Sequence, residues 1–224
     1  MTEPKPVSFR SAMTGMLVAA LWCCTTAASA DEVVYDVKVT LNWSEDTALS
    51  PPDDAHWSRL IAFAHSGRYT LFRDGDTASS GLALVATNGR VTVLEAEVAE
   101  AARRGRAAAP VILPGTDAGR GTFEFTLALS EKHDQVSFAT MLAPSPDWFS
   151  GVSNVSLKIP EGWRENLTVP LWVWDAGADS GQTYSGPNLP TQPRQSIRLL
   201  THPAFLQADG LRPIGRAVFS RVSP

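Results

Sequence analysis

The sequence predicts an all-β protein, an antiparallel β-sandwich with one short helix. Two segments, residues 33–43 and 122–129, alternate apolar and polar residues with the period of two that a half-buried strand requires. Further short apolar runs follow along the chain, separated by turn residues. Only residues 92–104 have the spacing of an amphipathic helix. Many short strands with a single helix are typical of a one-domain sandwich.

The strands are predicted from these runs. In the first alternating segment the apolar positions are Val33, Tyr35, Val37, Val39, Leu41 and Trp43, and in the second they are Phe123, Phe125, Leu127 and Leu129. Shorter runs predict strands at residues 69–72, 82–85, 136–142, 155–159, 169–174, 197–200 and 214–222. Pro170 places its strand at a sheet edge or at a strand start, because proline cannot donate a hydrogen bond to a neighbouring strand.

The predicted helix begins at Thr92, which has the spacing of a capping box with Glu95. It ends at Gly105, a residue type that commonly follows the last helical turn. Glu100 and Arg104 are four residues apart, so we expect them to form an ion pair on the helix surface.

The first 30 residues predict a secretory signal peptide. Two basic residues precede an apolar run at 13–22, and Ala28-Ser29-Ala30 has the small residues of a cleavage site. The apolar run is too short for a lasting transmembrane helix. Cleavage near Ala30 leaves a domain of residues 31–224, which we expect to be secreted or periplasmic and without stable membrane insertion.

Both cysteines, Cys23 and Cys24, lie inside this signal peptide, so the remaining domain uses no disulfide. A domain of this length buries enough surface to fold without one. Of the chain's 19 basic and 23 acidic residues, two basic and one acidic lie in the signal peptide, which leaves a net charge of −5. An acidic domain does not attract nucleic acid or an anionic membrane surface, so we expect neither as a partner.

An acidic site is predicted where two turn-rich segments meet. Asp147 lies in a turn-forming segment flanked by aromatic residues, and Asp175 and Asp179 lie in a loop that Gly177 and Gly181 allow to fold tightly. Oxygen ligands without a thiolate or imidazole suit a hard cation, and Ca²⁺, which takes about 6 to 8 oxygens, tolerates irregular loops. The alternative is that each aspartate only accepts hydrogen bonds from backbone N–H groups of its own turn.

The sequence resembles the spondin domain family over nearly all of the chain after residue 33. The motifs that carry this resemblance are YDVKVTLNWS, AHWSRLIAFAHS, PSPDWFSGVSNVSL and WDAGADSGQTYSGPNLPTQP. The resemblance implies a C2-like fold and a Ca²⁺ ion held by Asp147, Asp175 and Asp179. It also implies an exported, non-catalytic module for extracellular or cell-surface binding or adhesion, whose partner is an unknown protein or glycan.

The chain departs from the family at two points. Family members often have an acidic residue where this chain has Thr87, so the resemblance does not imply an extra ligand or a partner-binding role at that position. The cysteines that staple animal spondin domains are missing as well. Four aromatic residues are expected to pack beneath the site and orient it: Trp148, Phe149, Trp172 and Trp174.

A serine hydrolase is an alternative function. The Asp179-Ser180-Gly181 turn and the upstream His65 resemble parts of trypsin-like proteases. In those enzymes glycines flank the turn and supply oxyanion N–H groups, whereas here Ala178 and Gln182 occupy the flanks. The sequence therefore favours a protein that is not an enzyme.

Two further alternatives stay open. A glycosidase could use Asp147 and Asp175 as its pair of carboxylates, and a structural envelope protein would bind no ion. His56 and His65, without cysteine or a third ligand, are a weak metal signal, and we expect both to be partly buried and hydrogen-bonded. The chain also carries N-x-Ser/Thr sequons at Asn42, Asn154 and Asn166.

Overall fold

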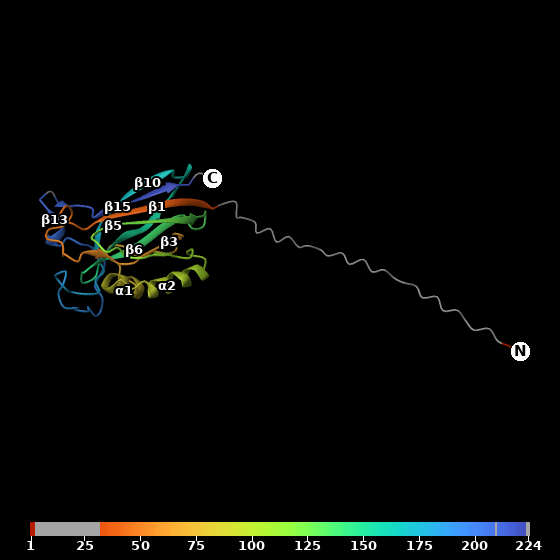
Figure 1. Cartoon of the computed structure of the whole chain (residues 1–224), viewed down its shortest axis with the longest axis horizontal. Coiled ribbons are helices and arrows are strands. Elements are labelled where there is room, and N and C mark those ends of the chain that lie inside the picture. Colours follow the sequence, from red (N-terminus) through yellow and green to blue (C-terminus); the bar gives the residue numbers. More distant parts are fainter. Residues whose placement is uncertain (3–31, 209, 223–224) are drawn as a thin grey trace. The chain divides into compact units, whose positions relative to one another are not determined.

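The structure is a computed structural model that describes residues 1–2, 32–208 and 210–222 (Figure 1). Almost all of the predicted signal peptide and its cleavage site lie outside the described residues. Among the residues that are described, no helix has the length and apolar character needed to cross a bilayer. The described domain is mainly antiparallel sheet, which confirms the predicted all-β sandwich.

One layer of the sandwich is a four-stranded antiparallel sheet with the strand order β10-β15-β1-β5. Its strands are β1 (Val33–Asn42), β5 (Arg120–Leu129), β10 (Asn166–Leu171) and β15 (Gly215–Arg221). Val37 of β1 lies opposite Phe125 of β5 and Phe219 of β15. In β1 every second side chain is buried, as the alternation of residues 33–43 predicts.

The second layer is a seven-stranded sheet in which β12, β11, β7, β6, β3 and β4 follow one another and β2 pairs with β6. Its strands are β2 (His56–Trp57), β3 (Leu60–His65), β4 (Val111–Leu113), β6 (Gln135–Ala143), β7 (Trp148–Ser156), β11 (Val173–Asp175) and β12 (Arg198–Leu199). Short hairpins pair β8 (Lys158–Ile159) with β9 (Gly162–Trp163), and β13 (Leu206–Gln207) with β14 (Gly210–Leu211). A 3-10 turn, η1, spans Pro203–Phe205.

Two strand predictions in this region need correction. The strand predicted at residues 169–174 is divided between the layers, because β10 belongs to the four-stranded sheet and β11 to the seven-stranded sheet, with Trp172 between them. The predicted edge position of Pro170 is confirmed, since β10 has a partner on one side only. The strand predicted at 155–159 is not one strand, because it covers the end of β7, which runs from Trp148 to Ser156, and the separate strand β8.

The described part of the domain has two α-helices where the sequence predicts one. The first, α1 (Ser80–Asn88), includes residues 82–85, which are wrongly predicted to form a strand. This helix is buried on most of its surface, so its apolar residues do not mark one face and resemble a short buried strand. Residues 69–72, also predicted as a strand, form part of an irregular connection between β3 and α1.

The second helix, α2 (Thr92–Arg103), lies where the sequence predicts it. The prediction of a capping box at Thr92 is wrong, because the N-cap residue is Val91 and no side chain caps the first turn. The predicted ion pair is present, with Arg104 Nε 2.7 Å from Glu100 Oε1. Gly105 follows the helix with φ of 65°, which suits a helix end.

The seven-stranded sheet is the middle of three layers, with the four-stranded sheet on one side and both helices on the other (Figure 1). Alternate residues of β3 therefore face two different cores: Leu60 and Ala62 belong to the core between the sheets, and Ile61 and Phe63 belong to the core beneath the helices. This explains why all six residues of β3 are buried.

Candidate functional site

Strand pairing brings the three predicted aspartates together. Asp147 immediately precedes β7, and Asp175 is the last residue of β11, the neighbouring antiparallel strand. Asp175 lies opposite Trp148 in the register, so the loop that follows β11 and contains Asp179 turns back over Asp147. Segments about 30 residues apart in sequence therefore share one site.

Asp147 is fully buried, and its two carboxylate oxygens have different surroundings. Oδ2 accepts hydrogen bonds from the backbone N–H of Ala178, at 2.6 Å, and of Asp179, at 3.0 Å. Oδ1 is buried and has no hydrogen-bond partner among the described residues. A buried carboxylate oxygen without a partner is costly, because it has lost its water without gaining a protein donor.

Asp175 folds over its own turn. Its Oδ1 accepts a hydrogen bond of 2.7 Å from the N–H of Gly177, and its Oδ2 lies 3.5 Å from Arg198 Nε on the adjacent strand β12. The Asp175 side chain is 15% exposed, which leaves it within reach of solvent. Asp175 Oδ1 therefore caps its own turn, as the alternative without a metal ion predicts, whereas Oδ2 does not.

Asp179 is held in the same manner and is more deeply buried, with 5% of its surface exposed. Its Oδ1 accepts from the N–H of Gly181 at 2.7 Å, and its Oδ2 accepts from the N–H of Leu189 at 2.9 Å. These bonds close the loop from 179 to 189 around the carboxylate.

The electrostatics of the cluster centre on Asp147. Burial, followed by the negative charge of Asp175, raises the pKa of Asp147 to about 7. The hydrogen bonds from Ala178 and Asp179 act in the opposite direction, because they favour the ionised form. On balance, the surroundings of Asp147 therefore disfavour its ionised form.

Within residues 32–208 and 210–222, no group of three His, Cys, Asp or Glu side chains is arranged to hold a metal ion. One observation nevertheless fits a cation, which is the unpartnered Oδ1 of Asp147 next to two further carboxylates. An oxygen-only donor set also suits a hard cation. The Ca²⁺ ligand set stays a prediction.

The aromatic residues around the site divide into two pairs. Trp148 and Phe149 are buried, as expected, and the ring of Trp148 lies 5.7 Å from that of Tyr184. Trp172 and Trp174 are half-buried and line a separate groove. The sequence alone does not reveal this groove, because its two walls are distant in the chain.

Ser180 and His65, the residues of the hydrolase alternative, each form hydrogen bonds with other residues. Ser180 Oγ donates to the carbonyl of Leu189 at 3.3 Å. His65 is buried in β3, with Nε2 2.7 Å from Ser137 Oγ and Nδ1 2.9 Å from the carbonyl oxygen of Ser66. His56 Nδ1 likewise lies 2.7 Å from the carbonyl oxygen of Asp54. The expectation that both histidines are hydrogen-bonded is confirmed.

Thr87 lies near the aspartate loop. It is in the last turn of α1, and its Oγ1 donates to the carbonyl of Ala83 at 2.8 Å. It lines a small cavity together with Ser145, Asp179 and Tyr184. A neutral side chain of α1 therefore lies at the same cavity as Asp179.

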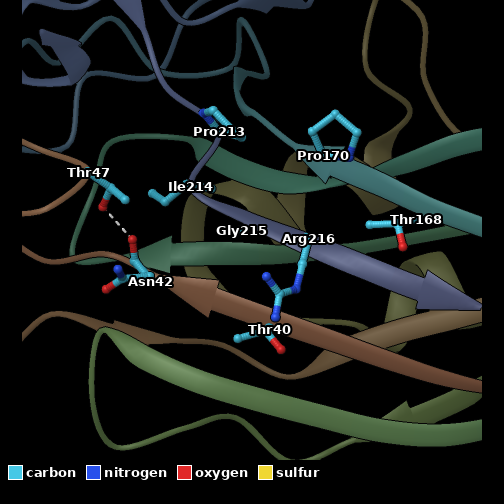
Figure 2. Close-up of a pocket in the computed structure, with 9 residues that line it drawn as sticks. All are labelled: Thr40, Asn42, Thr47, Thr168, Pro170, Pro213, Ile214, Gly215 and Arg216. Atoms are coloured by element: carbon cyan, nitrogen blue, oxygen red, sulfur yellow. Dashed lines mark hydrogen bonds between the residues drawn. The ribbon is translucent and has the colours of Figure 1, made fainter.

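The outer face of the four-stranded sheet has a cavity of about 480 Å³. Figure 2 shows Arg216 of β15 extending toward Thr40 of β1, with Thr168 and Pro170 of β10 on the other side. None of its lining residues is Asp, Glu, His or Cys. The cavity therefore lacks the residue types that most often act as general acid or base in catalysis.

Comparison with known proteins identifies the family of the chain. The Spondin_N family model matches residues 33–208. Spondin-2 of Homo sapiens is 32% identical over 204 residues, which cover 84% of this chain and 61% of the relative. Spondin-1 of Gallus gallus is 35% identical over 199 residues, which cover 81% of this chain and 24% of the relative. The chain thus spans less than two thirds of these relatives, and it belongs to the Spondin_N family.

Proposed function

We propose that this chain is an exported, non-catalytic module that binds Ca²⁺ and serves extracellular or cell-surface binding or adhesion. Membership of the Spondin_N family supports the extracellular type of module. The observation that carries the calcium proposal is the buried, unpartnered Oδ1 of Asp147 beside the carboxylates of Asp175 and Asp179.

A divalent cation would offset two costs at once. It would give Asp147 Oδ1 the partner that it lacks among the described residues, and it would neutralise the repulsion among the three carboxylates. Asp147, Asp175 and Asp179 would hold the ion, and bound Ca²⁺ would fix the loop after β11 against the start of β7. The ion then has a structural role, because it ties together two loops at one end of the sandwich.

Calorimetric titration with Ca²⁺ tests this proposal. The parent chain is compared with Asp147→Asn and with Asp117→Asn, which changes an exposed aspartate in the loop before β5. We expect the parent and Asp117→Asn to bind Ca²⁺ and Asp147→Asn to lose most of the binding. With a dissociation constant of about 10⁻⁴ to 10⁻³ M, an ion concentration ten times higher stabilises the fold by roughly 1.4 kcal/mol. A titration of the parent without binding heat and without a rise in melting temperature would refute the proposal.

The raised pKa of Asp147 is also what a general acid requires, so the glycosidase alternative has one observation in its favour. Full burial of Asp147 weighs against it, because a glycosidic oxygen must come within hydrogen-bond reach of the acid. The binding module is therefore the better supported function.

A further inference from the structure

We infer that the groove beside Trp172 and Trp174 binds a neutral oligosaccharide. The groove has a volume of about 480 Å³ and lies where the connection between β3 and α1 passes beside β7 and β10. The inference rests on the proposed binding function and specifies the chemistry of the partner. None of the three site aspartates lines the groove, so it can be tested apart from calcium.

Aromatic rings form one wall of the groove. Trp172 and Trp174 are half-buried, so part of each indole remains accessible. The ring of Trp174 lies 5.3 Å from that of Phe72, and Phe72 in turn lies 5.0 Å from the buried Phe149 in an edge-to-face arrangement. These contacts fix Trp174 in place, and an indole offers both an apolar face and a polar N–H to a ligand.

An irregularity in β7 fixes the neighbouring wall. The register between β6 and β7 shifts near Ser153 and Asn154, and Asn154 has φ of 59°. Ser153 Oγ accepts from the N–H of Phe72 at 3.2 Å, and Asn154 Nδ2 donates to the carbonyl of Tyr69 at 3.0 Å. The bulge therefore anchors the connection that carries Phe72, and a preorganised groove loses less entropy when a ligand binds.

The charges at the rim indicate the class of ligand. Arg73 and Asp74 are adjacent and exposed, and both line the groove. Their opposite charges cancel, which disfavours a strongly anionic or cationic ligand and supplies hydrogen-bond donors as well as acceptors. A neutral sugar ring matches this combination, because it has an apolar face for stacking and hydroxyl groups that both donate and accept.

The cavity on the four-stranded sheet differs from the groove in its charge and in its lack of aromatic residues. It contains one cationic side chain, Arg216, and no aromatic residue (Figure 2). It therefore offers no stacking surface for a sugar, and we assign the oligosaccharide to the groove at Trp172.

The test is a calorimetric titration of the full chain with hexasaccharides from cellulose, starch, laminarin, mannan and chitin. A heparin hexasaccharide and a proline-rich decapeptide serve as the anionic and peptide probes. We expect at least one neutral hexasaccharide to bind, and Trp172→Ala to weaken its binding at least about tenfold through loss of stacking. Asp74→Asn should weaken it as well, and Trp163→Ala, a half-buried tryptophan of β9 outside the groove, should leave it unchanged.

Asp74→Asn keeps the test decisive if Trp172→Ala does not fold, because Asp74 is exposed. Failure of every neutral hexasaccharide to bind more tightly than about 1 mM overturns the inference. Preferential binding of heparin or of the peptide that depends on Trp172 also overturns it. The same titrations in Ca²⁺ and in EDTA separate the two proposals, since we expect saccharide binding to persist in EDTA. Calcium binding without any saccharide binding refutes the groove inference alone, and saccharide binding without calcium binding refutes the calcium proposal alone.

Discussion

Asp147 Oδ2 accepts a 2.6 Å hydrogen bond from the backbone N–H of Ala178, a residue 31 positions further along the chain. This bond joins the turn before β7 to the loop after β11. It satisfies one oxygen of a buried carboxylate and leaves the other without a partner among the described residues. The stability of this end of the sandwich therefore depends on the ionisation of Asp147.

In calcium-free buffer, the contribution of Asp147 to stability should fall as the pH rises. Its pKa is raised from 3.8 to about 7 in the folded protein, so the folded state binds the proton more tightly than the unfolded state. The contribution is most favourable below about pH 4 and is lost by about pH 7, with a total change of the order of 4 kcal/mol. We would measure it as the difference in the free energy of urea unfolding between the parent and Asp147→Asn across this range.

In EDTA, the free energy of unfolding of Asp147→Asn should increase relative to that of the parent as the pH rises. In Ca²⁺ this relative increase should disappear, because the ion favours the ionised carboxylate in the folded parent. A difference between the two proteins that does not change with pH would contradict the assigned pKa. A difference that changes equally in EDTA and in Ca²⁺ would contradict the calcium proposal.

Gly177→Ala should disrupt the loop that covers Asp147. Gly177 has φ of 67°, and a Cβ atom there would lie 2.3 Å from the carbonyl oxygen of Gln195. The loop would have to move, and the N–H groups of Ala178 and Asp179 would move with it. We expect a loss of about 2 kcal/mol or more in the free energy of unfolding.

Gly67→Ala is the matched control for this change. A Cβ atom at Gly67 would meet Gln135 Nε2 at 3.5 Å, an ordinary contact, so its effect should stay within about 1 kcal/mol. If both alanine variants unfold at the same urea concentration, the close packing of Gly177 against Gln195 is not what holds the loop.

His65 should make the domain less stable in acid. Burial lowers the pKa of His65 below its ordinary value of 6.5, so the folded state holds the imidazole neutral with Ser137 as its partner. A histidine with a lowered folded-state pKa contributes stability above about pH 6.5, and this contribution decreases as the pH falls below that value. The direction is opposite to that of Asp147.

The comparison of parent and His65→Gln isolates this effect, because all other titrating groups are common to both. We expect the variant to lose less stability than the parent between about pH 7 and pH 5 in urea unfolding. His56→Gln should retain the acid sensitivity of the parent, since His65 is intact. An equal loss in the parent and in His65→Gln would show that the buried imidazole does not control it.

The alternation in the sequence correctly predicts β1 and β5, because one face of the four-stranded sheet is buried and the other is exposed. The same pattern fails for β3, which is buried on both faces, and for α1, which is buried on most of its surface. A short, fully buried apolar run has no period that separates a strand from a helix.

The sequence predicts which residues form the candidate site, but it does not predict their hydrogen bonds. The motifs around Asp147, Asp175 and Asp179 identify the acidic positions through the family resemblance. Their hydrogen bonds depend on the pairing of β7 with β11, which no local pattern specifies. The unpartnered oxygen of Asp147 and the groove at Trp172 are likewise products of tertiary structure.

Gly81→Ala should separate the two helices and destabilise the domain. A Cβ atom at Gly81 would lie 2.5 Å from Leu94 Cα, so α1 and α2 can approach this closely only with glycine at that position. The approach also lets Glu97 of α2 accept hydrogen bonds from the N–H of Gly81, at 2.8 Å, and from Ser79 Oγ, at 2.7 Å, at the start of α1. Alanine would force the helices apart and break these bonds, which we expect to cost about 2 to 3 kcal/mol.

Urea unfolding of Gly81→Ala and Glu97→Gln measures the clash and the cap separately, with the smaller loss expected for Glu97→Gln. A Gly81→Ala variant as stable as the parent would show that the helices are not held at this spacing, since alanine favours a helix by about 1 kcal/mol over glycine when nothing opposes it.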